Sequence, residues 1–292
     1  MKPYTIETTK NIKDFTFALL SDIHYSSYSN TQKVEKILEN ILKQSPAFIC
    51  MLGDTVNDAK IDKEHCQVLL EILNSIAHKI PMYIILGNHD QLTYNGKDFI
   101  PCSAQQSNYL KMLKLFPSIK LLQNQRISFD NISITGLAQE GDFYVKEQED
   151  SLRFKEICNK EFPYIQNPAS FNIVLQHTPN PYVNKEIAQT VTAFQNTDLI
   201  CAGHIHNGCI PTYFDFPLNK IHIPNRGIIG IKGDRFTLFP KNARGIYPVT
   251  DTAQGITSAP IQTFGDEKLF KYLNFLYPPK VEYVHVKKKC IK

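Results

Sequence analysis

Short apolar runs alternate with amphipathic stretches in the first part of this 292-residue chain, and the alternation limits the folds open to it. The apolar runs have the length of buried strands and lie at residues 15–21, 47–52 and 82–86. Between them, residues 31–44 and 62–78 repeat apolar side chains at helical spacing, and Asp62 is a residue type that caps helices. The pattern favours an α/β fold in which helices cover a mainly parallel sheet.

From about residue 120 the pattern consists mainly of strand-like pieces. Strands are predicted at residues 119–122, 126–129, 132–137, 171–176, 199–202, 220–223 and 235–239, and a helix near 151–158. A second sheet packed on the first is the natural inference. We expect residues 1–292 to form a single domain, which residues 207–292 complete.

Composition excludes several classes of protein. A net charge of +4, with four lysines gathered in residues 286–292, gives no basic face for nucleic acid, and we expect that lysine-rich end to be frayed and solvated. The seven cysteines show no paired spacing, which favours a reducing compartment. Because no apolar run is long enough to span a bilayer, we expect a cytoplasmic protein, or a membrane-associated one if an N-terminal anchor has been removed.

Five polar blocks each follow one of the predicted strands. They are Ser21-Asp22-Ile23-His24, Gly53-Asp54, Gly87-Asn88-His89-Asp90, Gln176-His177 and Gly203-His204-Ile205-His206. Ligands of α/β sheets bind at the carboxyl ends of strands, so these blocks can converge although they are distant in sequence. The glycines let the chain turn sharply or approach a ligand closely.

The residue types in these blocks indicate metal-assisted hydrolysis. Carboxylates, an amide oxygen and imidazoles, without a thiolate, suit Mn, Fe or Zn. A pair of such ions generates a hydroxide nucleophile and stabilises charge on a phosphoryl group. Taken singly, an Asp-x-His or Gly-Asp segment is more often a turn, and His177 alone would be an ordinary core histidine. Five such blocks, in order and each at a strand end, make coincidence a poor explanation.

The series of blocks resembles the calcineurin-like metallophosphoesterase superfamily, and residues 4–17 look similar to a bacterial subgroup that is often membrane-associated. The resemblance implies a four-layer α/β/β/α sandwich of two packed mixed sheets with flanking helices. It implies two divalent metal ions (Mn, Fe or Zn). One would be bound by Asp22, His24 and His206 and the other by Asn88, His177 and His204, with Asp54 bridging both.

The resemblance also assigns catalytic roles. His89 would not bind metal; it would donate a proton to the leaving-group oxygen or stabilise charge on the phosphoryl group. Asp90 would hold the His89 ring in orientation, although a cap of a turn is the alternative for this residue. The nucleophile would be a metal-bound hydroxide.

The substrate is predicted only as a phosphate ester, with nucleotide and lipid-linked esters both open. A phosphodiester is favoured, because His89 suits an alkoxide leaving group; a phosphomonoester is the alternative. A non-catalytic metal-binding scaffold for a protein partner would be expected to lose ligands, which this chain keeps. The oligomeric state is left open.

Loops are expected to select the substrate. The candidate loops are residues 91–106, 141–146 and 226–244, the candidate arginines Arg226, Arg235 and Arg244, and the candidate aromatic residues Tyr94, Phe99, Phe143 and Tyr144.

Overall fold

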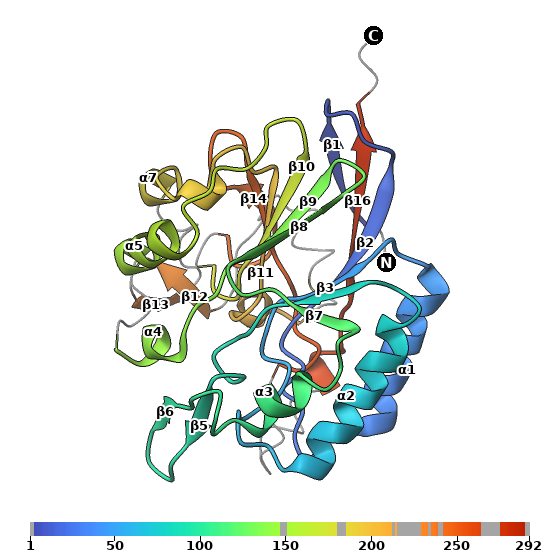
Figure 1. Ribbon diagram of the computed structural model, residues 1–292, viewed down its shortest axis with the longest axis vertical. Coiled ribbons are helices and arrows are strands. Elements are labelled where there is room, and N and C mark those ends of the chain that lie inside the picture. Colours follow the sequence, from blue (N-terminus) through green and yellow to red (C-terminus); the bar gives the residue numbers. More distant parts are fainter. Residues whose placement is uncertain are drawn as a thin grey trace.

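The computed structural model describes residues 3–146, 151–179, 185–211, 214, 229–232, 235–238, 242–263 and 275–289, and Figure 1 shows their arrangement. The first sheet has the strand order β1-β16-β2-β3-β4-β7. Its strands are β1 (Tyr4–Thr8), β2 (Phe15–Leu20), β3 (Ile49–Met51), β4 (Met82–Ile84), β7 (Ile119–Leu121) and β16 (Glu282–Lys288). Neighbouring strands are parallel except for β16 and β2.

The second sheet has the order β14-β15-β11-β10-β9-β8. Its strands are β8 (Gln125–Phe129), β9 (Ile132–Gly136), β10 (Phe171–Leu175), β11 (Leu199–Ala202), β14 (Gly245–Pro248) and β15 (Gln254–Thr257). The inner four are parallel, and each edge strand is antiparallel to its neighbour. Both sheets are therefore mixed.

The two sheets face each other across an apolar core. Phe17 and Leu19 of β2 point into this core, toward residues such as Ile173 and Cys201 of the second sheet. Their neighbours Ala18 and Leu20 point to the opposite face, because side chains alternate along a strand. Each sheet thus buries both faces.

Helices cover the two outer faces. The first sheet is covered by α1 (Thr31–Gln44), α2 (Lys63–Ala77) and α3 (Asn108–Leu113), and the second by α5 (Ser151–Glu161) and α7 (Lys185–Ala188). Helix α1 buries Val34, Leu38 and Ile41, and Asp62 caps α2 by accepting a hydrogen bond from the backbone N–H of His65. The predicted four-layer α/β/β/α sandwich is confirmed.

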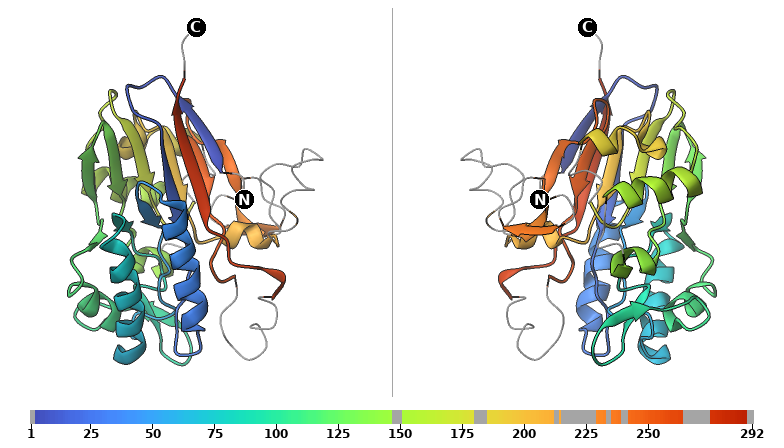
Figure 2. Two further views of the ribbon diagram at one scale, coloured as in Figure 1. Left: turned by 90° about the vertical axis from the view of Figure 1, so that its right-hand side faces the viewer. Right: turned by 90° about the vertical axis from the view of Figure 1, so that its left-hand side faces the viewer.

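The lysine-rich end of the chain differs from the prediction. We expected residues 286–292 to be frayed, but Val286, Lys287 and Lys288 belong to β16, which lies between β1 and β2. Val284 and Val286 are fully buried, and this burial fixes the strand although it ends in two exposed lysines. Figure 2 shows this red C-terminal strand beside the blue N-terminal one.

Two small two-stranded sheets lie outside the sandwich. Strands β5 (Leu92–Tyr94) and β6 (Phe99–Pro101) form a hairpin, and β12 (Ile229–Lys232) pairs with β13 (Arg235–Leu238). The latter agrees with the strand predicted at 235–239, whereas the strand predicted at 220–223 lies outside the described residues. Among the helices described, none combines the length and apolar character needed to cross a bilayer.

Candidate metal centre

The predicted site residues come together where strands of both sheets end. Three blocks follow the adjacent parallel strands β2, β3 and β4, and two follow the adjacent parallel strands β10 and β11. The carboxyl ends of these strands meet at one edge of the sandwich, so that side chains far apart in sequence become neighbours. All seven predicted metal ligands lie in this cluster.

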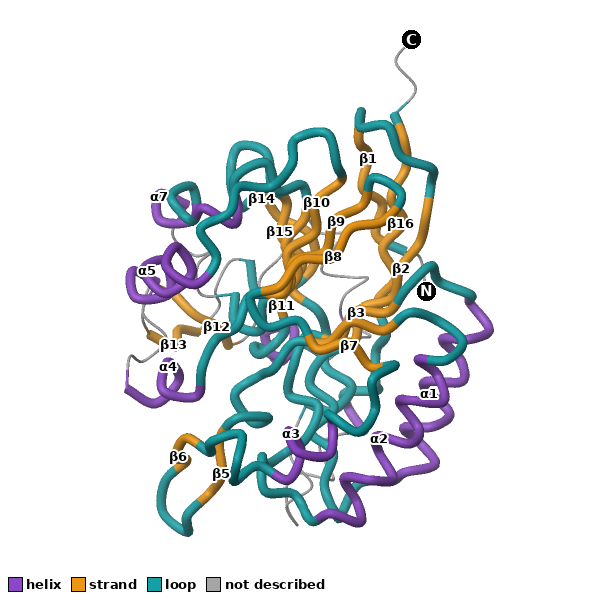
Figure 3. Tube along the Cα trace, viewed as in Figure 1, coloured by secondary structure: helices purple, strands orange, loops and turns teal. Residues whose placement is uncertain are grey.

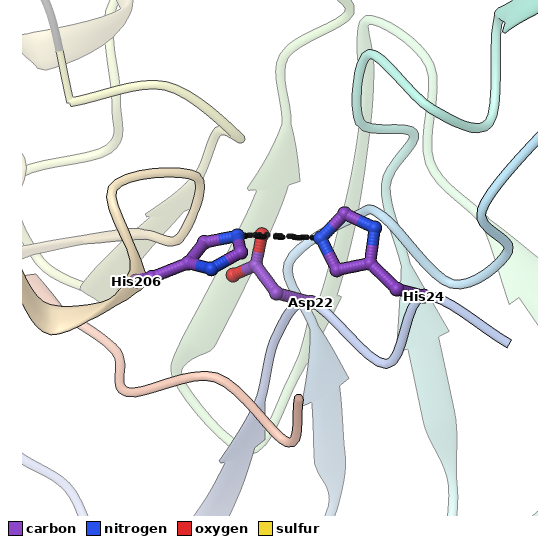
Figure 4. A group of neighbouring side chains, drawn as sticks. All are labelled: Asp22, His24 and His206. Carbon is purple, nitrogen blue, oxygen red and sulfur yellow. Dashed lines mark hydrogen bonds and ion pairs between the residues drawn. The ribbon is translucent and has the colours of Figure 1, made fainter. Parts of the chain in front are cut away.

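The first group contains Asp22, His24 and His206 (Figure 4). The Nε2 atoms of His24 and His206 lie 3.2 Å apart. Oδ1 of Asp22 lies 3.8 Å from Nε2 of His24 and 3.4 Å from Nε2 of His206. One carboxylate oxygen and two imidazole nitrogens thus converge on a single point.

The second group contains Asn88, His177 and His204. Oδ1 of Asn88 lies 3.0 Å from both Nε2 of His177 and Nδ1 of His204. The two ring nitrogens lie 3.2 Å from each other. An amide oxygen and two imidazoles again share one point.

Asp54 lies between the two groups. Its Oδ2 atom is 3.6 Å from Nε2 of His24 and 3.3 Å from Nε2 of His177. The other oxygen, Oδ1, accepts a hydrogen bond of 2.8 Å from the backbone N–H of His89. A single carboxylate oxygen therefore faces both groups, as a bridging ligand must.

The backbone is strained at most of these positions. Asp22, His24, Asp54, His204 and His206 all have positive φ, between 48° and 67°. This conformation is costly for residues other than glycine and persists only where the surrounding structure enforces it. Strain repeated at five clustered polar residues is a mark of a functional site.

Glycines allow the loops to approach one another. A Cβ at Gly87 would collide with the side chain of Asp54, and one at Gly203 would collide with Ser21. The glycines were predicted to allow a sharp turn or a close approach to a ligand; here the close approach is between neighbouring loops.

Backbone carbonyls fix the orientation of two imidazoles. Nδ1 of His177 donates to the carbonyl of Leu52, and Nδ1 of His206 donates to that of Thr263, each at 2.6 Å. With Nδ1 donating to the carbonyl, Nε2 faces the cluster and can offer its lone pair to a cation that displaces the Nε2 proton. This is the tautomer that a metal-binding imidazole needs.

Mutual electrostatics keep both carboxylates charged. Burial opposes charge on Asp22, but the adjacent His206, with His177, outweighs burial and lowers the pKa of Asp22 to about 2. Asp54 is likewise buried, yet His177 and His89 hold its pKa well below the usual range. Both carboxylates are thus available as anionic ligands, paired with imidazole protons that a divalent cation could displace.

The same buried, charged surroundings shift the pKa values of two imidazoles in opposite directions. Burial, together with nearby His89, lowers the pKa of His24 to about 3, so this ring is neutral. Burial also opposes a proton on His177, but Asp54 overrides burial and raises the pKa of His177 to about 10. His177 therefore holds a proton where a divalent cation would replace it.

The donor set fits divalent metal ions. Within the described structure, Oδ1 of Asp22 is buried and has no hydrogen-bond partner, although it faces two imidazole nitrogens. A buried anionic oxygen without a donor is costly unless a cation is near. The set of carboxylates, imidazoles and an amide suits Mn, Fe or Zn.

His89 lies beside the first group, but Asp90 does not orient it as we expected. Nδ1 of His89 donates to the backbone carbonyl of Asn57 at 2.8 Å. In the described chain, the Asp90 carboxylate instead accepts three backbone N–H bonds, from Gly87, Thr55 and Val56. Asp90 ties the loop after β4 to the loop after β3, and the alternative interpretation as a cap of a turn is the one that the hydrogen bonds favour.

Gln139, which the sequence did not single out, supports the second group. Its Oε1 atom accepts the backbone N–H bonds of His177 and Thr178. The side chain of Gln91 reaches back to the Gln139 carbonyl at 2.6 Å. Gln139 follows β9 as the ligand blocks follow their strands, but a lone glutamine carries no recognisable signal.

The structure shows the positions of some of the candidate substrate-selecting residues. Residues 141–146 form the short helix α4 (Gly141–Lys146), and Phe143 is buried as an anchor. Arg244 is also buried, whereas Arg226 and the side chain of Arg235 lie outside the described residues. Of the other aromatic candidates, Tyr144 packs near His177 and His204, while Phe99 packs against His89.

Comparisons with known proteins point to one family. The family model described as calcineurin-like phosphoesterase matches residues 15–208. An uncharacterized metallophosphoesterase of Campylobacter jejuni is 23% identical over 72% of this chain and 49% of its own length. A UDP-2,3-diacylglucosamine pyrophosphatase of Chlamydia trachomatis is 25% identical over 64% of this chain and 62% of its own length. The chain thus spans about half to three fifths of these relatives.

Solved structures with a similar arrangement include a dimetal phosphatase from Danio rerio. It is 12% identical, with a TM-score of 0.45 over 84% of this chain and 87% of that chain. Another is a phosphopantetheinyl hydrolase from Mycobacterium tuberculosis, 11% identical, with a TM-score of 0.38 over 85% and 90%.

Proposed function

The chain belongs to the calcineurin-like phosphoesterase family, and on that premise we propose that it hydrolyses a phosphate ester with the help of two divalent metal ions. One ion would be Mn, Fe or Zn bound by Asp22, His24 and His206. The other would be bound by Asn88, His177 and His204, and Asp54 would bridge the two.

The position of Asp54 carries the proposal. Its Oδ2 atom faces an imidazole of each group at 3.3 Å and 3.6 Å, and its backbone is strained to hold it there. A bridging carboxylate has no use in a single-ion site. When bound, two ions supply a nucleophile from water and stabilise the charge of the reacting phosphoryl group.

His89 is proposed as the proton donor to the leaving oxygen. Because its Nδ1 proton is committed to the Asn57 carbonyl, only Nε2 can exchange a proton with a substrate. The ring lies 4.6 Å from that of His24, measured between ring centroids, which places it at the edge of the metal cluster. Asp90 contributes indirectly, by holding the loops that carry Asp54 and His89.

A phosphorus with two organic substituents is the favoured reaction centre. A proton donor matters most for a poor leaving group such as an alkoxide. The similarity to UDP-2,3-diacylglucosamine pyrophosphatases supports this preference, because a pyrophosphate linking two groups also presents disubstituted phosphorus. A nucleotide-linked or lipid-linked substrate is compatible with that chemistry, and a phosphomonoester is the second candidate.

The test is hydrolysis of bis(p-nitrophenyl) phosphate and of p-nitrophenyl phosphate by metal-stripped protein re-supplied with Mn²⁺, Fe²⁺ or Zn²⁺. We expect metal-dependent hydrolysis, faster for the diester, that is absent from Asp54→Ala. Faster hydrolysis of the monoester would replace the diester assignment. No hydrolysis of either ester despite two bound ions would point to a narrow natural substrate, and no hydrolysis without bound metal would favour the scaffold alternative.

A cytoplasmic location is proposed from the cysteines. The six cysteines in the described residues are free, and five of them are buried. Free thiols are typical of reducing compartments. Trapping of free thiols in intact cells would test the proposal, since disulfide-bonded protein would contradict it.

A further inference from the structure

The hairpin of β5 and β6 presents large apolar side chains to solvent beside the metal centre. Figure 3 shows it apart from the two large sheets, near α4. The exposed fractions are 54% for Tyr94, 43% for Phe99 and 39% for Ile100. Leu92, by contrast, is buried and anchors the hairpin. Three large exposed apolar side chains on so short a hairpin call for a function.

The rings of Phe99 and Tyr94 extend from the candidate metal centre toward solvent. The ring of Phe99 lies 5.3 Å from that of His89 between centroids, and the ring of Tyr94 lies 5.4 Å from that of Phe99. His89 in turn contacts the metal-ligand candidate His24. A connected row of rings therefore leads from the metal cluster, through the proposed proton donor, to solvent.

The backbone of the hairpin is held in place by hydrogen bonds of its own chain. Tyr94 and Phe99 are cross-strand partners, so their side chains share one face of the hairpin. Oδ2 of Asp58 accepts the backbone N–H of Tyr94 at 2.9 Å and the hydroxyl of Thr93 at 3.2 Å. Asp58 follows Asn57, whose carbonyl holds the His89 ring. The segment that orients His89 thus also fixes the hairpin.

From this arrangement we propose that Phe99 and Tyr94 bind an apolar group carried on the departing side of the substrate. The inference rests on the proposed function, because it takes His89 as the group facing the leaving oxygen. An organic group attached to the leaving oxygen would lie beside His89, and Phe99 is the first exposed ring that it would contact. Rings carried on a hairpin whose backbone is already fixed bind it at little cost in backbone conformational entropy. The substrate class is a phosphate ester whose departing alcohol is aromatic or alkyl.

The test compares dissociation constants of symmetric diesters, measured by calorimetry on the Mn²⁺-loaded full chain. Diphenyl and dibutyl phosphate should bind at least about tenfold more tightly than dimethyl phosphate, as burial of about 60 Å² of apolar surface predicts. Whichever of diphenyl and dibutyl phosphate binds more tightly shows whether the departing group is aromatic or alkyl. Equal constants for all three would overturn the proposal.

Variants assign the preference to this face. Phe99→Ala should reduce the preference for diphenyl or dibutyl phosphate over dimethyl phosphate to about twofold. Tyr94→Ala should also weaken this preference, and it leaves the contact between Phe99 and His89 in place. Ile100→Ala is the matched control, because alternation along β6 places Ile100 on the opposite face, and it should keep the full preference. An unchanged preference in both Phe99→Ala and Tyr94→Ala would also overturn the proposal.

Hydrolysis of bis(p-nitrophenyl) phosphate by the same wild-type preparation separates the two proposals. Absent hydrolysis with a preserved apolar preference would overturn the proposed catalysis and leave the binding face standing. Intact hydrolysis with no preference would overturn the binding face alone.

Discussion

At the scale of residues, the geometry of the candidate metal centre depends on main-chain atoms as much as on side chains. The carbonyls of Leu52, Thr263 and Asn57 orient three imidazoles, and a backbone N–H fixes Asp54. These partners cannot be recognised from residue types. The types and order of the candidate ligands could be read from the sequence, whereas the orientation of His89 by Asn57 rather than Asp90 could not.

Removal of the His89 side chain should separate catalysis from metal binding. Asp54 is held by the backbone N–H of His89, which His89→Ala retains. We therefore expect wild-type metal content with kcat lowered by about 100-fold or more. Metal content is measured by elemental analysis, and kcat with a diester that has an alkoxide leaving group, because p-nitrophenolate leaves with little help from a proton donor.

His65→Ala is the control, since that ring bonds Asp62 at the exposed start of α2, away from the metal cluster, and it should change neither quantity. Loss of metal from His89→Ala equal to that from Asp54→Ala would contradict the role given to His89.

Metal binding should release protons. Because the pKa of His177 lies near 10 in the metal-free site and that of His206 is also raised, both rings carry protons that a cation must displace. Affinity should therefore rise between pH 6.5 and pH 8.5. Calorimetry at pH 7.5 in two buffers of different ionisation enthalpy counts the protons, and binding without net release would refute the prediction.

At the scale of elements, local pattern predicted the strands and helices that are buried on both faces or clearly amphipathic. Helix α1 and strand β11 occupy the predicted ranges. Strands β1, β15 and β16 were missed, because each pairs with a strand remote in sequence. Strands β5, β6, β12 and β14 were also missed; they are short and pair within local hairpins. For β16, the partners lie at the opposite end of the chain, at residues 4–8 and 15–19.

Burial of β16 gives a test of its place in the sheet. Val284 is fully buried between the sheets, so Val284→Ala should lower the free energy of unfolding by about 2 kcal/mol. Lys287→Ala, on the exposed part of the same strand, should stay within about 0.5 kcal/mol of wild type. Urea unfolding measures both, and equal effects would argue against a buried β16.

At the scale of the molecule, strands of both sheets have their carboxyl ends at the same edge of the sandwich. The periodicities indicated two packed sheets, but the order of the four layers followed from the family resemblance. Charge and apolar patterns specify which faces are buried; they do not specify which sheet edge a remote segment joins. The joining of β16 to the first sheet is a case of this kind.

Chelation should destabilise the whole fold. The candidate ligands come from five loops of both sheets, so ions bound there would link the two halves of the sandwich. Ions bound only by the folded state stabilise it by mass action, and an excess of chelator should lower Tm. The Asp54→Ala variant should show a much smaller shift. An unchanged wild-type Tm would count against filled metal sites.

The most direct test of a two-ion centre is a titration of metal-stripped protein with Mn²⁺, following bound metal per chain and hydrolysis of bis(p-nitrophenyl) phosphate together. Activity is predicted to remain low until the second ion binds and to reach its maximum at about two ions per chain. Full activity at one ion per chain, or activity that does not depend on bound metal, would contradict the assignment of Asp54 as a bridge.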